Sequence, residues 1–372
     1  MYHDTIRPLL FRMDAEWAHT VTLWGARLAQ STVASWVESR FAFSDERLAQ
    51  TLWGRPFPNP LGLAAGADKN AKAVRFWEAI GFGFVEVGSV SAQACTGNPK
   101  PRAFRLPDDE ALINRMGLNN EGAHAVAKRL QRTADARTRP LGVNLAKTHD
   151  PAIMGDAART DFVQSFRTLA PRADYVVLNI SCPNTREGKT FEETDTLDAL
   201  LTSIRDAQAG SPAHDVPLLV KVSPPVSDKV AYDSQVEGVV TVAMAHNVDG
   251  FVATNTASDR KGLTADEERL EAIGPGGLSG KPLEQRALHW VRHLYRLTDG
   301  TVPIIGVGGI HDADSAYARI RAGASLLQIY TALVYDGPSL VGRINRGLAE
   351  RLERDGFASL SDAVGVDAQQ PA

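Results

Sequence analysis

Asparagine residues recur at the ends of several short apolar runs in this sequence. Asn144, Asn179 and Asn255 each lie at or just past the end of such a run, and Asn184 follows closely after one of them. An amide offers both a hydrogen-bond donor and an acceptor. Several converging amides suit a flat ligand edged with carbonyl and N–H groups, such as a pyrimidine or an isoalloxazine. Asparagine also caps turns at loop starts, so one alone would mean little, whereas several at separate ends favour a ligand.

Two lysines, Lys69 and Lys221, also follow or end apolar runs, with few carboxylates opposing them. A lysine that becomes buried needs an anionic partner. One of the two could stabilise negative charge on the N1–C2=O edge of a reduced flavin, which is a usual way for a protein to tune that cofactor. The competing interpretation is a lysine whose stem lies on the rim of the fold with its ammonium group in water.

Cys182 is the candidate proton-transfer group. It follows an apolar run, and its neighbours Ser181, Pro183 and Asn184 form a polar loop, which favours contact with a ligand. A free cysteine is more often a small buried hydrophobe. The nine histidines are scattered, with none at a metal-ligand spacing, and no G-x-S-x-G motif is present. We therefore predict neither a metal site nor Ser-His-Asp chemistry.

Glycines cluster near the end of the chain, at residues 306–309 and at Gly323. The first cluster follows the seventh apolar run, and Gly323 precedes the eighth. Glycines at these two positions let backbone N–H groups approach a phosphate, and barrel proteins often bind phosphate there. A Gly-Val-Gly-Gly string is weak by itself, and its place in the order of the runs gives it weight.

Eight apolar runs supply the elements that must position these residues. Each is continuous and rich in Val, Ile and Leu, as strands buried on both faces should be. The runs are residues 61–65, 84–90, 141–145, 175–180, 218–222, 250–253, 303–307 and 325–329. Helix-compatible segments lie between most of them, including residues 71–80, 122–132, 196–207 and 283–297.

Strands that alternate with helices indicate a parallel sheet. Eight of them in this length predict an α/β fold, a (β/α)8 TIM barrel with its active site at the carboxyl ends of the strands. An open doubly wound sheet is the alternative, and the missing glycine fingerprint after the first run lowers it. Three long segments, 91–118, 181–193 and 254–281, are predicted to be lids or binding loops, with a small hairpin around 104–106.

Residues 1–40 are predicted to be a separate helical segment. The barrel would occupy 41–366, beginning with a connector at 41–60, and 367–372 would be a disordered tail. Asp14 can cap a helix in which Trp17, Val21, Trp24 and Leu28 repeat at helical steps. One interpretation is a helix pair packed on the barrel. The other is a pair whose outer apolar face dips into a bilayer interface.

The composition excludes several classes of protein. The net charge is −4 and basic residues form no patch, which argues against a nucleic-acid partner. The two cysteines lie far apart, which indicates a reducing compartment rather than a disulfide scaffold. We find no signal-peptide layout, and no stretch long enough to cross a bilayer is free of charge. The chain should be soluble or lie on a membrane surface.

Seven stretches of the sequence resemble the dihydroorotate dehydrogenase family, specifically its quinone-dependent class. They include Asn-Ile-Ser-Cys-Pro-Asn-Thr at 179–185 and Ile-Ile-Gly-Val-Gly-Gly-Ile at 304–310. The others are residues 59–69, 100–106, 113–119, 253–256 and 276–282. The resemblance extends from about residue 1 to residue 366, and the motifs in this order are together highly specific.

The resemblance implies oxidation of dihydroorotate to orotate in pyrimidine biosynthesis, with FMN as cofactor and ubiquinone or menaquinone as final acceptor. Cys182 would take the C5 proton while C6 delivers hydride to FMN. The implied cofactor contacts are Ala65, Gly66, Ala67, Asp68, Lys69, Ser89, Asn144, Asn179, Lys221, Thr254, Gly280, Gly309, Tyr330 and Thr331. The implied substrate contacts are Lys69, Asn114, Arg115, Met116, Gly117, Leu118, Asn179, Asn184, Asn255 and Thr256.

The same resemblance implies that residues 1–40 form the mouth of a quinone tunnel, which would be lined by His19, Arg105 and Tyr330. It implies a monomer held peripherally at the cytoplasmic face of the cell membrane, and it favours the membrane interpretation of the helix pair.

One residue departs from the class that the chain resembles. The quinone-dependent class usually has Ser at the base position, whereas the soluble classes usually have Cys, as here at Cys182. A thiol with a pKa near ~8.5 supplies some thiolate at neutral pH. The alternatives are therefore a soluble fumarate- or NAD-coupled enzyme, an FMN-dependent tRNA dihydrouridine synthase, which shares an Asn-x-x-Cys-Pro string, and a non-catalytic flavin- or phosphate-binding scaffold.

Overall fold

The computed structural model describes residues 2–181, 190–225 and 234–369, and its centre is a closed barrel of eight parallel strands. The strands follow one another around the barrel in chain order, and the last pairs with the first. They are β3 (Leu61–Leu63), β4 (Phe84–Val90), β7 (Leu141–Leu145), β8 (Tyr175–Asn179), β9 (Leu218–Val222), β10 (Gly250–Ala253), β12 (Ile304–Val307) and β13 (Leu326–Ile329). The predicted (β/α)8 barrel is confirmed, and each strand lies within its predicted run.

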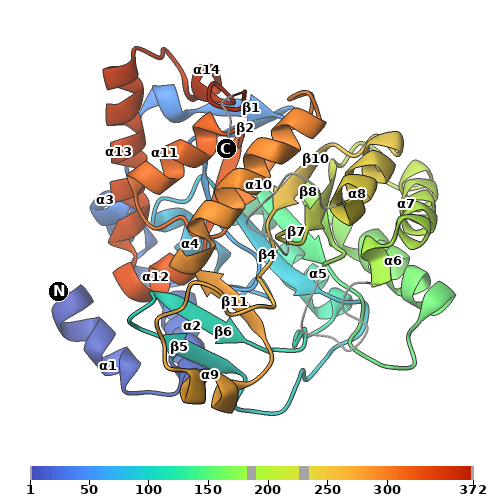
Figure 1. Ribbon diagram of the computed structural model, residues 1–372, viewed down its shortest axis with the longest axis horizontal. Helices are drawn as coiled ribbons and strands as arrows, with labels where there is room; N and C mark the ends of the chain where they lie inside the picture. Colours follow the sequence, from blue (N-terminus) through green and yellow to red (C-terminus); the bar gives the residue numbers. More distant parts are fainter. Residues whose placement is uncertain (1, 182–189, 226–233, 370–372) are drawn as a thin grey trace.

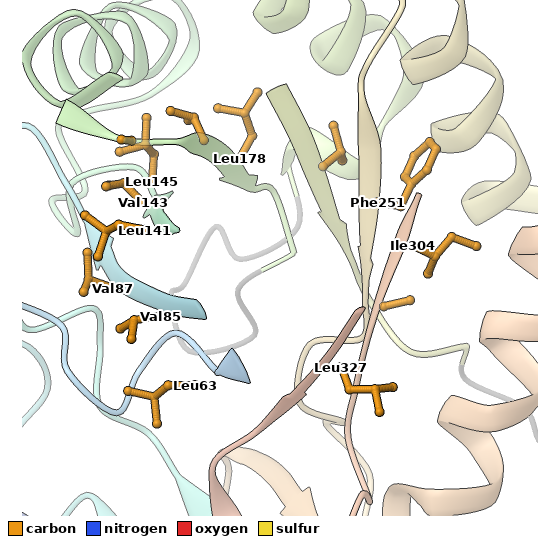
Figure 2. Packing of buried hydrophobic residues seen from close by; sticks show 14 of the residues in the cluster. Leu63, Val85, Val87, Leu141, Val143, Leu145, Leu178, Phe251, Ile304 and Leu327 are labelled. Atoms are coloured by element: carbon orange, nitrogen blue, oxygen red, sulfur yellow. The ribbon is translucent and has the colours of Figure 1, made fainter. Parts of the chain in front are cut away.

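These runs form strands because both of their faces are buried. Alternate residues such as Val85 and Val87 face outward into the large core between barrel and helices. Figure 2 shows this outward set around the strands. The residues between them, such as Phe84 and Tyr175, face inward and form a smaller core inside the barrel. Full burial of each large apolar side chain stabilises the fold by roughly 1.5–3 kcal/mol.

A ring of helices surrounds the barrel (Figure 1). It contains α4 (Val74–Ala79), α5 (Ala123–Thr133), α6 (Gly155–Leu169), α7 (Thr194–Ala209), α8 (Ser234–Ala245), α10 (Glu284–Leu297), α11 (Ala313–Arg321) and α13 (Ser339–Asp355). The four predicted helical segments are confirmed to within a few residues. Helix α4 begins later than predicted because the Asp68 carboxylate accepts the backbone N–H groups of Lys72 and Ala73, at 2.8 and 2.7 Å, and closes a turn ahead of the helix.

Short helices and single 3-10 turns complete the described chain. The short helices are α9 (Glu267–Ile273), α12 (Thr331–Asp336) and α14 (Leu360–Ala363). The 3-10 turns are η2 (Glu46–Leu48), η3 (Ala134–Ala136), η4 (Ala170–Arg172), η5 (Thr190–Glu192) and η7 (Lys281–Leu283). Asp367 and Ala368, which we expected in a disordered tail, are held in place: Asp367 pairs with Arg321 at 2.6 Å, and Ala368 is buried.

The segment predicted to be only a connector contains a hairpin that closes one end of the barrel. Strands β1 (Gln50–Leu52) and β2 (Arg55–Phe57) are joined through Trp53 and Gly54, both at positive φ, as a tight hairpin turn requires. Trp53 and Phe57 pack on the inward-facing aromatic residues of the barrel. The indole N–H of Trp53 donates to the Asp249 carbonyl at 2.8 Å.

A three-stranded antiparallel sheet lies at the other end of the molecule (Figure 1). It consists of β5 (Ala103–Leu106), β6 (Ala111–Asn114) and β11 (Gly277–Gly280). The hairpin predicted around 104–106 is confirmed as β5–β6, and β11 joins it from the long segment after β10. Two of the predicted loops therefore pair with each other over the carboxyl ends of the barrel strands.

The N-terminal segment forms η1 (Tyr2–Ile6, a π-helical turn), α1 (Arg7–Phe11), α2 (Ala15–Thr32) and α3 (Ala34–Phe41). Asp14 caps α2 as predicted, accepting the Trp17 N–H at 2.9 Å. The apolar stripe does not pack on the barrel: Trp17, Trp24 and Leu28 are 59, 63 and 51% exposed, and the small residue Ala26 faces the core instead. Trp36 on α3 is exposed as well. None of the described helices is long and apolar enough to cross a membrane.

Candidate active site

The amide residues singled out from the sequence come together at the carboxyl ends of the barrel strands. Asn144 lies on β7 and Asn179 ends β8, while Thr254 and Asn255 directly follow β10. Ser89 lies near the end of β4, the strand that pairs with β7 on the side away from β8. Because parallel strands present their carboxyl ends on one face of a barrel, side chains far apart in the sequence meet there.

These side chains form a continuous chain of hydrogen bonds. The Ser89 hydroxyl lies 2.5 Å from Asn144 Oδ1, and Asn179 Nδ2 donates to Ser89 Oγ at 2.9 Å. Asn255 Nδ2 donates to Asn179 Oδ1 at 3.1 Å and to the carbonyl and hydroxyl oxygens of Ser181, both at 3.0 Å. Ser181 in turn donates to the backbone carbonyl of Lys221 at 2.9 Å. The ends of five neighbouring strands, β4, β7, β8, β9 and β10, are thereby linked by one polar network.

A buried carboxylate that we did not predict lies at the inner end of this network. Glu86 of β4 is fully buried and accepts from Asn144 Nδ2 at 3.0 Å. Gln328 Nε2 and the Tyr175 hydroxyl donate to its other oxygen, at 2.6 and 3.2 Å. A signal was present in the sequence, because Glu86 and Gln328 interrupt otherwise apolar strands, but we read those runs as continuous.

The two lysines occupy different settings. Lys69 follows β3, and its ammonium group donates to the side-chain oxygen of Asn119, a partner that we did not predict. Lys221 lies on β9 with 7% of its surface exposed. Beside Lys69, the Asp68 carboxylate is turned toward the start of α4, and burial raises its pKa despite the N–H donors that oppose the shift. A contact from Asp68 to a ligand would therefore come from its main chain.

The loop 114–118 is held on several sides. Asn114 Nδ2 donates to Gly277 O at 3.4 Å, and the Arg115 guanidinium turns away to stack on the Phe104 ring. The Met116 carbonyl accepts the backbone N–H of residue 98 at 3.1 Å, and His149 Nδ1 donates to Gly117 O at 2.9 Å. Leu118, which completes the loop, has a positive φ of 55°. The main chain of this loop is rigidly placed beside Lys69 and Asn119.

The glycines predicted to bind phosphate lie on a close-packed surface. Gly309 has φ +75°, and a Cβ there would lie 2.2 Å from the Cα of Glu284, so only glycine fits. Arg319 is fully buried behind this loop and donates to the Gly308 carbonyl at 3.0 Å. Gly280 lies against Thr331, whose hydroxyl is 2.9 Å from that of Ser279. A glycine loop beside a buried cation suits an anionic group such as a phosphate.

The three residues assigned to a quinone tunnel come from different elements: His19 lies on α2, Arg105 on β5, and Tyr330 directly after β13. The Tyr330 hydroxyl is 3.4 Å from His19 Nδ1, and the Tyr330 ring lies beside Gly66. Burial raises the pKa of Tyr330 to about 12. Burial, followed by the charge of Lys69, lowers the pKa of His19 to about 4, so the imidazole is neutral at physiological pH.

Arg105 lies farther out than the other two. It donates to the Leu10 carbonyl at 2.8 Å and stacks on Phe11. A cavity of about 300 Å³ opens beside it between α1 and the β5–β6 hairpin, lined in part by Phe104 and Arg269. The predicted tunnel residues therefore lie on one side of the molecule, along the N-terminal helices.

Two of the predicted site residues, Cys182 and Asn184, lie outside the described residues. Ser181, which precedes them, is fully buried and anchored by Asn255 and Lys221, so the chain enters that segment from the strand ends. Ala65, Ala67 and Thr256 also lie at the strand ends, and the Thr256 N–H donates to Asn255 Oδ1 at 2.9 Å. Within 2–181, 190–225 and 234–369, no group of His, Cys, Asp and Glu side chains could hold a metal ion.

The barrel carries amides, lysines and a glycine loop at its carboxyl ends; we call this loop, Gly308 and Gly309, the glycine cradle. These features are typical of TIM-barrel proteins that bind a ligand at that face. The sequence model of one family, dihydroorotate dehydrogenase, matches residues 47–352. This chain belongs to the dihydroorotate dehydrogenase family.

Relatives and solved structures show the same likeness. A Thermobifida fusca protein named dihydroorotate dehydrogenase (quinone) is 43% identical over 100% of this chain and 98% of its own length. A protein of the same name from Chloroflexus aurantiacus is 47% identical over 93% of this chain and 96% of its own length. The crystal structure of Eimeria tenella DHODH in complex with ferulenol has a TM-score of 0.82 at 32% identity, covering 95% of this chain and 96% of its own.

Proposed function

We propose that this chain oxidises dihydroorotate to orotate, with FMN as hydride acceptor and a membrane quinone as final electron acceptor, in pyrimidine biosynthesis. The observation that carries the proposal is the convergence of Asn144, Asn179 and Asn255 on one face of the barrel of a dihydroorotate dehydrogenase family member. Amides suit a substrate that is edged with carbonyl and N–H groups. The names of the relatives support the quinone as acceptor.

The residues at the strand ends fit FMN. Gly308 and Gly309 both have a positive φ, and a Cβ at Gly309 would clash with the Glu284 backbone. Arg319 adds positive charge behind this glycine loop, which suits the phosphate. Ser89 and Asn144 offer polar groups to the ring, and Lys221 lies opposite Asn179 on the neighbouring strand. When bound, FMN supplies a two-electron acceptor that the side chains of the protein lack. The full set of cofactor contacts is the one given from the sequence.

Oxidation of dihydroorotate also needs a base, because a proton leaves C5 as hydride leaves C6. We propose Cys182 for this role. The anchored Ser181 supports the assignment, because its hydrogen bonds to Asn255 and to the Lys221 carbonyl tie the start of that loop to the amide network. A thiol has a pKa near ~8.5, so a thiolate fraction is available without a strong activating partner.

We propose that residues 1–40 bring the enzyme to the cytoplasmic face of the cell membrane as a peripheral monomer, ahead of the barrel at 41–366. The exposed Trp17, Trp24 and Trp36 support this, because tryptophan suits the boundary between water and lipid. The quinone would enter past Arg105 and reach the flavin beside His19 and Tyr330. The neutral imidazole of His19 places no extra positive charge next to an apolar ring.

An acceptor screen tests the proposal. Purified protein loaded with FMN is mixed with dihydroorotate and, in parallel, with a ubiquinone or menaquinone analogue, fumarate or NAD. We expect flavin reduction by dihydroorotate and turnover with a quinone. Turnover with fumarate or NAD and none with quinone would transfer the chain to the soluble classes, to which Cys182 points. Failure of dihydroorotate to bleach the flavin would overturn the dehydrogenase itself.

A further inference from the structure

We infer that Glu86 is a positioning residue which sets the hydrogen-bond direction of the whole amide network, and with it the groups that the site presents to its ligands. The inference rests on the proposed function, because FMN and orotate are the ligands concerned. Glu86 itself lies below the strand ends and reaches them through Asn144.

The direction follows from one acceptor. A carboxylate accepts hydrogen bonds and donates none, so Asn144 must turn its Nδ2 group toward Glu86, at 3.0 Å. The oxygen of the same amide then faces Ser89, whose hydroxyl must donate to it, at 2.5 Å. An amide that was free to turn over would leave this order undecided, because its nitrogen and oxygen have nearly the same shape.

The same logic continues outward along the network. Once the Ser89 hydroxyl has donated its single hydrogen, its oxygen accepts from Asn179 Nδ2, at 2.9 Å. The oxygen of Asn179 therefore faces Asn255 and accepts from its Nδ2, at 3.1 Å. Along this path from Asn255 to Glu86, each donor points toward the carboxylate. Reversing the amide of Asn144 or of Asn179 would break two of these bonds.

The surroundings of Glu86 hold it in the accepting role. Gln328 is fully buried and turns its Nε2 group to the carboxylate, at 2.6 Å, while its own oxygen meets no hydrogen-bond partner among the described residues. Tyr175 donates its hydroxyl, at 3.2 Å. Burial, and then the negative charge of Glu86, raise the pKa of Tyr175 well above its usual value, so the phenol keeps its proton.

The direction decides what the site offers. The amide oxygens of Asn144, Asn179 and Asn255 each already accept a hydrogen bond, from Ser89, Asn255 and the Thr256 N–H respectively. One N–H of Asn144 and one of Asn179 remain beyond those used in the network. The network is therefore set to recognise acceptors, such as the carbonyl and carboxylate oxygens of orotate or the acceptor edge of a flavin ring. The reversed network would meet these atoms with oxygens.

A structural role alone explains Glu86 poorly. Removing a carboxylate from water costs free energy that its partners only partly return, and an apolar side chain of similar size would often stabilise such a position equally well. The neighbouring interior positions are apolar or aromatic, including Phe84 and Leu326. The contact from Glu86 to Asn144 gives its placement a purpose that packing lacks.

The test compares Glu86→Gln with two other variants of the full-length protein. FMN affinity is measured by flavin fluorescence on the apoprotein, and orotate affinity by the change in the visible spectrum of the bound flavin. Tyr175→Phe is the matched control, because it removes a different hydrogen-bond donor to the Glu86 carboxylate and leaves the bond from Asn144 in place. The double variant Glu86→Gln, Gln328→Glu moves the carboxylate from residue 86 to residue 328. The new carboxylate accepts from the amide nitrogen of residue 86, so the amide oxygen of residue 86 faces Asn144 again.

We expect Glu86→Gln to weaken orotate binding at least about tenfold, the usual effect of losing a hydrogen-bond donor that faces a charged group. Tyr175→Phe should stay within about twofold of the wild type, and the double variant should recover most of the loss. Wild-type affinity in Glu86→Gln overturns the inference, as does a double variant that binds as weakly as the single one. If Glu86→Gln does not fold, the double variant decides in the same way. A wild-type protein that binds neither FMN nor orotate would instead overturn the proposed function.

Discussion

The two ends of the barrel differ in polarity: aromatic side chains fill one end, and polar residues line the other. At the amino ends of the strands, the β1–β2 hairpin inserts Trp53 and Phe57 against the inward-facing Phe84 and Tyr175, and the interior is closed by aromatic rings. At the carboxyl ends, amides, a serine and glycines line the same interior. Apolar burial stabilises the first end, and hydrogen-bonding groups, which we propose bind the ligands, occupy the second. Glu86 lies between the two regions, in contact with Tyr175 on one side and Asn144 on the other.

Replacement of the proposed base at the polar end should have the strongest effect on the reaction. Cys182→Ala should slow flavin reduction by dihydroorotate by about 10²–10⁴-fold, the usual contribution of a general base. FMN should remain bound, because the glycine cradle and the amides are untouched. Stopped-flow absorbance of the flavin measures the rate, and Cys95→Ala is the matched control. Unchanged single-turnover reduction would move the base to another residue.

The aromatic end should respond in stability rather than in binding. Phe57 is 1% exposed, and Phe57→Ala should lower the free energy of unfolding by about 3–5 kcal/mol, as the loss of a buried phenylalanine usually does. Chemical denaturation measures this change. Orotate affinity of the folded fraction should stay near the wild-type value. A parallel fall in affinity would show that the two ends are coupled more strongly than we infer.

The exposed face of α2 should affect acceptor use without affecting either end of the barrel. The double variant Trp17→Ser, Trp24→Ser should change the free energy of unfolding by less than about 0.5 kcal/mol, because both side chains are mostly exposed. Cosedimentation with lipid vesicles and turnover with a long-chain quinone should both fall, while reduction of the flavin by dihydroorotate stays unchanged. Thr20→Ala, on the same helix, is the control. Full vesicle binding by the double variant would exclude this face as the membrane contact.

Through His19, the stability of the fold should depend weakly on pH. The pKa of His19 is lowered from 6.5 to about 4, so the unfolded chain takes up a proton at a higher pH than the folded one. This residue therefore contributes stability above about pH 6.5 that is lost as the pH falls toward 4. Unfolding measured across that range should be less pH-dependent in His19→Gln than in the wild type. Identical slopes would show that His19 is hydrated in the folded protein.

Much of the barrel was accessible from local pattern. The runs at 84–90, 141–145 and 218–222 match their strands residue for residue, because strands buried on both faces are mostly apolar along their whole length. The hairpin of residues 50–57 escaped prediction, because strands of three residues, one of them containing Pro56, carry little periodicity. The third N-terminal helix, α3, also went unpredicted.

The candidate site divides in the same way. Asn144, Asn179, Asn255 and Lys221 were predictable, because each follows or ends an apolar run whose place in the barrel is set by chain order. Asn119, the partner of Lys69, was not predictable, because the contact joins two loops across the barrel face. The outward orientation of the tryptophan stripe was also undecided, since a helical period shows that two faces differ and leaves open which of them meets the core.

The strands, their order and the amides at their ends could be predicted from the sequence, because they depend on local composition and on connection rules that hold for parallel barrels. The orientation of those amides could not, because it is set by contacts that form only in the folded barrel. That orientation depends on Glu86 and Gln328, which lie 242 residues apart in the chain and meet inside the closed barrel. The residue types of a polar network can be read from the local sequence. The direction of its hydrogen bonds around Asn144 follows from the Glu86 carboxylate, which accepts hydrogen bonds and donates none.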